Sequence, residues 1–162
     1  MRRTTYTLPV PPRVTQLLLD SSLLLILVVG RLEPHRLGRD ARLKAYTPAD
    51  YELLRAYSAM FPTRVTTPHV LAEVSNHLDI INPSLLPALR TALSDWSPLR
   101  ESWTAATSLV AEHEYTAIGL TDTAILLAAR PKTVVMTSDR RLWVALVKQG
   151  RNALHYSDVV RR

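Results

Sequence analysis

The sequence contains no cysteine, and this absence excludes disulfide scaffolds, cysteine-ligated zinc sites, iron–sulfur clusters and thiol nucleophiles. Its four glycines are too far apart to form a dinucleotide-binding GxGxxG motif or a phosphate-binding P-loop. The uninterrupted apolar run at residues 23–29 has seven residues, whereas a membrane-spanning helix needs about 20. We therefore expect no membrane partner, and any metal ion must be bound by oxygen or imidazole ligands.

What is present is typical of one globular domain. The chain has 162 residues, of which 47% are hydrophobic and 21% are charged. A basic start followed by a leucine-rich stretch is compatible with a signal peptide, but Pro9, Pro11, Pro12 and Asp20 interrupt it. We expect a cytoplasmic protein with an N-terminal arm at residues 1–13 and a single domain at residues 14–162.

The positive charge of the chain is concentrated near its ends. The formal net charge is +6, with eight basic and three acidic residues in positions 1–45 and eight basic and two acidic in positions 130–162. The middle, residues 46–129, has four basic and nine acidic residues. This pattern is explained either by scattered solvated arginines or by a basic rim around an acidic site, and it favours a polyanionic partner.

Apolar runs alternate with helical patterns along the chain. Residues 14–20 and 133–139 are predicted as buried strands that end in an acid, and residues 63–67 and 152–157 as further strands. Helices are predicted at residues 22–32, 49–60, 68–78, 83–97, 101–114, 121–130 and 140–150. Strands that alternate with helices and lack strict polar alternation predict an α/β fold, with three layers and a central, mainly parallel sheet.

Four acids stand at the edges of apolar elements. Asp20 and Asp139 follow two predicted strands, although each is equally well explained as a helix N-cap. Asp122 is the only charged residue between positions 115 and 129, in a helix that is otherwise apolar; favourable interaction with the helix dipole is the alternative explanation. Glu73 flanks the apolar stripe of its predicted helix, where an exposed glutamate is common.

If these four acids converge, their mutual repulsion requires a counter-charge. Carboxylate oxygens suit Mg²⁺ or Mn²⁺, and such ions also bind phosphate oxygens and support phosphodiester hydrolysis. The set of acids therefore predicts a metal-dependent site.

The motifs around these acids resemble those of PIN domains, a family of metal-dependent ribonucleases. The segments LLLDSS, TPHVLAEVSNHL, GLTDTAILLAA and VVMTSDRRL are similar to the family's four acidic motifs in order and spacing. The resemblance implies that Asp20, Glu73, Asp122 and Asp139 bind the metal and act in catalysis. Ser22 falls where the family often has asparagine, and Thr137 matches a frequent threonine or serine. Some members have a further acid where this chain has Leu126 or Ser138, so a second metal is less expected.

The resemblance implies an endoribonuclease that uses Mg²⁺ or Mn²⁺ and has RNA as its substrate. Two further expectations follow from the resemblance. The protein could be a toxin that is held by an antitoxin protein, and it could form a homodimer. The alternative is a catalytically idle PIN-like module that binds RNA or a protein partner. Arg140 and Arg141 are candidates to contact phosphates, with solvated surface residues as the equal alternative. The three tryptophans are expected in the core or at an interface rather than as base-stacking platforms.

Overall fold

The computed structural model describes residues 13–96 and 98–160, and within them the strands form one five-stranded sheet in the order β3-β2-β1-β4-β5. Every neighbouring pair of strands is parallel. The strands are β1 (Gln16–Leu19), β2 (Thr63–Thr66), β3 (Leu99–Glu101), β4 (Thr133–Thr137) and β5 (Asn152–His155). The predicted α/β class with a parallel central sheet is therefore confirmed.

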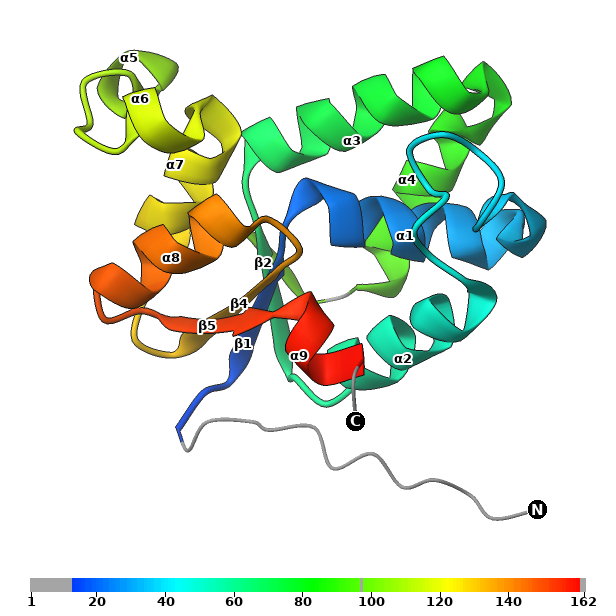
Figure 1. Ribbon diagram of the computed structural model, residues 1–162, viewed down its shortest axis with the longest axis horizontal. Helices are drawn as coiled ribbons and strands as arrows, with labels where there is room; N and C mark the ends of the chain where they lie inside the picture. The colour runs from blue at the N-terminus through cyan, green and yellow to red at the C-terminus, as the bar shows by residue number, and fades with distance from the viewer. Residues whose placement is uncertain (1–12, 97, 161–162) are drawn as a thin grey trace.

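Two groups of helices cover the two faces of the sheet (Figure 1). The first group connects β1 to β3 and comprises α1 (Ser21–Leu32), α2 (Pro48–Ser58), α3 (Pro68–Ile81) and α4 (Leu86–Asp95). The second group connects β3 to β5 and comprises α5 (Ala106–Leu109), α6 (Tyr115–Ile118), α7 (Leu120–Ala128) and α8 (Arg140–Lys148). The chain crosses the sheet in one direction from β1 to β3 and in the opposite direction from β3 to β5. Because the crossovers between parallel strands are right-handed, the two groups of helices lie on opposite faces.

Three short helices complete the described chain. They are the 3-10 turns η1 (Pro34–Arg36) and η2 (Pro83–Leu85) and the C-terminal helix α9 (Tyr156–Val160). No helix in residues 13–96 or 98–160 is long and apolar enough to cross a membrane.

The two central strands are buried on both sides. Leu17, Leu18 and Leu19 of β1 are at most 2% exposed, and the whole of β4 is buried. Continuous apolar runs are what a strand between two helical layers requires. The carboxyl ends of β1 and β4 lie side by side, since Leu19 pairs with Met136, so the acids that follow these strands share one edge of the sheet.

Helix α1 is the most buried helix of the first group. Residues 23–29 are all buried, as expected of a helix that is apolar on every side. Gly30 allows α2 to pack closely, because a Cβ atom at this position would lie 2.6 Å from ring carbons of Tyr51. Helix α2 begins with a cap at Thr47, in which Thr47 and Asp50 each accept a hydrogen bond from the other's backbone N–H.

The segment between α4 and α7 differs from the prediction. A helix was predicted over residues 101–114, but there the structure has the end of β3, a loop and the short helix α5, and α6 begins only after it, at Tyr115. This segment lacks a continuous apolar stripe: Leu109 is the one large apolar side chain buried within residues 101–114. Strand β3 has only three residues, and two of them are exposed at the edge of the sheet, so it carries no apolar signal.

The predictions for the last strand, the tryptophans and the N-terminal arm have different outcomes. The last strand ends at His155 rather than at residue 157, and α9 follows it directly. Trp96 is buried, but Trp103 is 74% exposed, so a core position is wrong for Trp103. The predicted N-terminal arm lies outside the described residues, apart from Arg13.

Candidate functional site

Asp20 joins three elements at the carboxyl edge of the sheet. It follows β1 and caps α1, where its Oδ1 accepts a hydrogen bond from the Leu23 N–H at 2.8 Å. Its Oδ2 accepts hydrogen bonds from the Thr137 hydroxyl at 2.5 Å and the Ser138 N–H at 2.7 Å. Burial raises the pKa of Asp20 above its ordinary value, although these hydrogen bonds oppose the rise. The N-cap interpretation of Asp20 is therefore correct, and the residue also anchors the turn after β4.

Asp139 lies in that turn and caps α8. Its Oδ1 accepts hydrogen bonds from the backbone N–H groups of Arg141 and Leu142, at 2.6 and 3.3 Å. Its Oδ2 lies 3.7 Å from the Arg141 guanidinium. The Asp139 N–H donates to the Thr137 hydroxyl at 2.9 Å, so Thr137 connects the first and last acids of the set.

Asp122 is in the first turn of α7 but does not cap it. The N-cap position is occupied by Gly119, and no side chain forms a cap hydrogen bond at this helix end. Burial is the largest cause that raises the pKa of Asp122 to about 7, followed by the negative charges of Asp139, Asp20 and Glu73 in that order, while the charge of Arg141 lowers it. Asp122 therefore lies within electrostatic reach of all three other predicted acids.

Glu73 approaches the other acids from α3. Its Oε2 accepts a hydrogen bond from the Ser21 hydroxyl at 3.0 Å, and its Oε1 lies 3.6 Å from His77 Nε2. Its side chain is 41% exposed, so the surface interpretation is partly correct. The sequence resemblance pointed to Ser22, but Ser22 is exposed and Ser21 is the serine that contacts an acid.

His77 and Tyr46 were not identified from the sequence. The spacing of four residues between Glu73 and His77 is a signal that could have found the histidine, because such residues are neighbours on a helix. Burial and the charge of Arg42 lower the pKa of His77. Tyr46 lies near Asp20 and hydrogen-bonds to Ser138, and burial raises its pKa. It lies in the loop before α2, where no pattern indicates a role.

The chemistry of the four acids suits a divalent cation that retains water. Their oxygens are hard ligands, and the negative charges around Asp122 outnumber the one opposing charge that acts on it within the described residues, that of Arg141. However, no three histidine or acidic side chains among residues 13–96 and 98–160 are arranged as a metal site. Both oxygens of Asp20 also accept protein hydrogen bonds. The carboxylates therefore fit an ion that keeps several of its waters, as Mg²⁺ commonly does.

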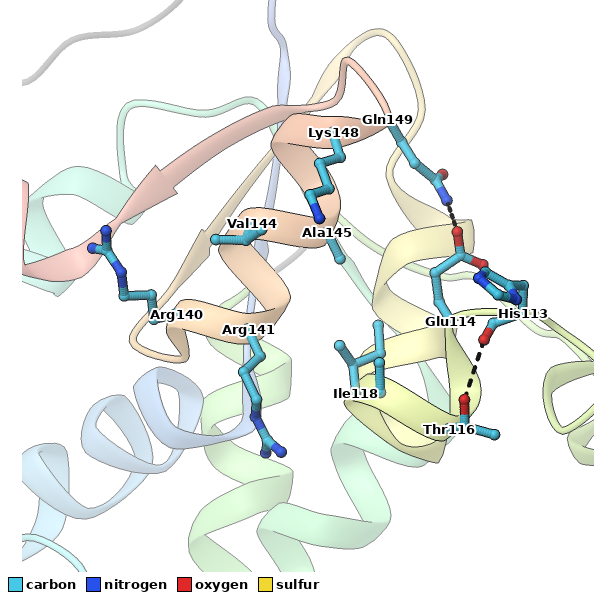
Figure 2. A pocket seen from close by; sticks show the side chains of 11 residues that line it. His113, Glu114, Thr116, Ile118, Arg140, Arg141, Val144, Ala145, Lys148 and Gln149 are labelled. Carbon is cyan, nitrogen blue, oxygen red and sulfur yellow. Dashed lines mark hydrogen bonds between the residues drawn. The ribbon is translucent and has the colours of Figure 1, made fainter.

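A surface groove lies beside these acids, between α6 and α8 (Figure 2). Arg141 lies at its end near Asp139, and Figure 2 shows its side chain pointing away from Lys148. Arg140 points to the other side of α8, where its guanidinium lies 5.6 Å from the centre of the Trp143 ring. The two arginines that are adjacent in sequence therefore have different surroundings.

No known protein family, curated protein or solved structure matches this chain. The resemblance to PIN domains thus depends on the four sequence motifs. What it implies about activity is a proposal, which the arrangement of the acids supports.

Proposed function

We propose that the protein is a Mg²⁺- or Mn²⁺-dependent endoribonuclease of the PIN type. The observation that carries this proposal is the gathering of four acids from separate elements at the carboxyl edge of a parallel sheet. There the negative charges of the other three acids raise the pKa of Asp122. Sites in open parallel sheets form at this edge. Such a cluster is unfavourable for the fold alone, which supports a role that requires it.

Each acid has a distinct part in this proposal. Asp122, Asp139 and Glu73 would hold the ion, in part through water. Asp20 fixes the geometry, because its hydrogen bonds hold the start of α1 and the turn before α8 together. When bound, the cation supplies positive charge to phosphate oxygens and activates water for attack on phosphorus. Arg141 adds a fixed positive charge at the rim, where a phosphate could pair with it.

A catalytically idle module that binds RNA or protein is the second candidate. It is favoured by the finding that no three acidic or histidine side chains in the described part of the chain form a ready metal site. The two candidates differ in one property, since only the enzyme needs the cation to act on RNA. An antitoxin partner and a homodimer are compatible with either candidate.

Cleavage of mixed RNA with Mn²⁺, with Mg²⁺ or with EDTA separates the two candidates. We expect cleavage with metal, no cleavage in EDTA, and a loss of about a hundredfold in Asp122→Asn, because this removes one charge from the site. Asp79→Asn is the matched control, since Asp79 is exposed on α3. Cleavage that persists in EDTA or in Asp122→Asn would contradict the proposal, and binding of RNA without cleavage would support the idle module.

A further inference from the structure

A cavity of about 200 Å³ lies between α1, α2, α4 and the start of β2. Helix α1 packs against both α2 and α4, and in Figure 1 these three helices lie on the side of the sheet away from α7 and α8. Ser58 and Asp95, which line the cavity, end the helices that precede β2 and β3. The cavity therefore lies toward the amino edge of the sheet, at the opposite end from the four acids.

The residues around this cavity carry an excess of positive charge. Arg31 of α1, Arg55 of α2 and Arg64 of β2 line it. Among the described residues that line it, Asp95 is the one acid, and it forms an ion pair with Arg31. Arg55 pairs with Glu52 at 2.8 Å, but both side chains are exposed, so water screens this pair. The lining thus has two more positive than negative charges, which favours a doubly charged anion.

Arg64 and Ser58 bring buried hydrogen-bond donors to the cavity. One terminal nitrogen of the Arg64 guanidinium donates to the Ser58 carbonyl at 2.9 Å, which holds the guanidinium beside Ser58. The Arg64 Nε–H and the Ser58 hydroxyl are buried and have no acceptor within residues 13–96 and 98–160, and Ser58 is only 3% exposed. Burial also lowers the pKa of Arg64. Because a buried donor without an acceptor costs free energy, an acceptor bound here would be stabilising.

The size of the cavity and its donors indicate the class of ligand. Its volume of about 200 Å³ is smaller than that of sites for drug-sized molecules, which is about 300–1,000 Å³. The cavity therefore suits a small anion better than a whole nucleotide. Guanidinium groups form paired hydrogen bonds with carboxylates and phosphates. A phosphate carries nearly two negative charges and three strong acceptor oxygens, so it matches the charge excess and the number of donors better than a carboxylate does.

We propose that this cavity binds a phosphate dianion, either as the free ion or as the terminal group of a small monoester. Its oxygens accept hydrogen bonds from the buried donors of Arg64 and Ser58, and the exposed Arg31 and Arg55 pair with it at the opening. Since these residues belong to α1, α2 and β2, the bound anion also links three elements of the fold. The site requires no metal, and it does not depend on the proposed function.

The test is isothermal titration calorimetry of the full-length protein with sodium phosphate, in EDTA, at pH 8 and constant ionic strength. Arg64→Gln removes the buried guanidinium, Ser58→Ala removes the buried hydroxyl, and Arg55→Gln removes an exposed cation. Arg90→Gln is the matched control, because Arg90 is exposed on α4 and does not belong to the described lining of the cavity. Sodium acetate and glycerol 1-phosphate are titrated in the same way.

We expect one phosphate to bind per chain. Arg64→Gln and Ser58→Ala should each weaken this binding about tenfold, because each removes a hydrogen bond to a charged group. Arg55→Gln should weaken it about threefold, since its charge is partly screened, and Arg90→Gln less than about twofold. Acetate should bind at least about tenfold more weakly than phosphate, because it has one charge and two oxygens.

Several outcomes would overturn the proposal: no saturable binding of phosphate, equal losses in Ser58→Ala and Arg90→Gln, or acetate that binds as tightly. If Arg64→Gln fails to fold, Ser58→Ala decides the question. Its melting temperature without phosphate should not fall, because the hydroxyl has no acceptor in the described part of the chain. Tighter binding of glycerol 1-phosphate than of phosphate would support a monoester as the occupant, and weaker binding would support the free ion.

Discussion

The environment of the Asp122 carboxyl group disfavours its ionised form. Burial and three neighbouring acids raise its pKa from 3.8 to about 7, and the charge of Arg141 opposes the shift. The folded protein therefore holds a proton on Asp122 between about pH 4 and pH 7 that the unfolded chain releases. Without metal, the free energy of unfolding should fall as the pH rises through this window. Burial raises the pKa of Asp20 too, so Asp20 adds to the same trend.

Asp122→Asn should remove much of this dependence on pH. At pH 8 without metal, we expect the variant to be more stable by about 1–2 kcal/mol, less than the full linkage value because solvent screens the partly exposed carboxylate. At about pH 3 the difference should largely vanish, since the acid is then mostly protonated in both states. Urea unfolding at the two pH values measures this, and a variant that is less stable at pH 8 would show that Asp122 supports the fold.

Thr137 is the second residue whose role is testable. Its hydroxyl donates to buried Asp20 and accepts from the Asp139 N–H, so Thr137→Val leaves one acid short of a donor. We expect a loss of about 2–3 kcal/mol in the free energy of unfolding, because a hydrogen bond to a buried charged group is lost. Thr133→Val is the matched control in the same buried strand. The Thr133 hydroxyl donates to the neutral Gln16 amide oxygen, so we expect Thr133→Val to lower the free energy of unfolding by only about 1 kcal/mol. Equal losses would contradict a special role of Thr137.

At the scale of single residues, the sequence identified the acids and one of their partners, Thr137, but not Ser21, His77 or Tyr46. Asp20, Asp122 and Asp139 were recognisable because a charge next to an apolar run must lie at an edge of the fold. Ser21 was missed in favour of Ser22, since their orientations depend on where α1 begins. Tyr46 could not be predicted, because its proximity to Asp20 depends on the path of a loop.

At the scale of elements, Gly119 determines how α7 begins. It separates α6 from α7 with φ +84° and ψ 179°, a region that is almost exclusive to glycine. Asp122 follows three residues later, so the orientation of this turn also sets the position of the acid.

Gly119→Asn should therefore cost about 1–3 kcal/mol of stability. Gly150→Asn should cost less, because Gly150 follows α8 with φ +67°, a value that asparagine tolerates at helix ends. Neither position has an atom near an added Cβ, so crowding does not distinguish them. Thermal unfolding of the two variants gives the comparison. If both lose equal stability, the unusual ψ of Gly119 is not the cause.

The strength of the apolar signal also explains which elements were predictable. Strands β1 and β4 were found because both faces are covered and each sequence contains a continuous apolar run. Strand β3 was missed because it is a three-residue edge strand with Arg100 and Glu101 exposed. Its presence depends on pairing with β2, a contact between distant segments that local pattern does not reveal.

At the scale of the molecule, the concentration of basic residues near the ends of the chain was visible in the sequence, but its geometry was not. Arg140 and Arg141 were one candidate pair for phosphate contacts. The fold separates them, since Arg141 lies beside Asp139 and lowers the pKa of Asp122, whereas Arg140 lies over the Trp143 ring. Substitution of either arginine should therefore change the salt dependence of RNA binding, whereas only substitution of Arg141 should change the pKa of Asp122.

Both Arg140→Gln and Arg141→Gln should reduce the salt dependence of RNA binding. If each contacts one phosphate of a single strand, the slope of log affinity against log salt should fall by about 0.7 in each variant. Only Arg141→Gln should also affect the acids, because its loss raises the pKa of Asp122 further. Stabilisation by Mn²⁺ requires ionised carboxylates, so in this variant its onset should move to higher pH, while Arg140→Gln keeps the original onset. Melting temperatures with and without Mn²⁺ between pH 5 and pH 9, together with binding at several salt concentrations, measure both effects. Unchanged slopes would make both arginines ordinary surface residues, and an equal shift of onset in both variants would contradict the separation seen in the structure.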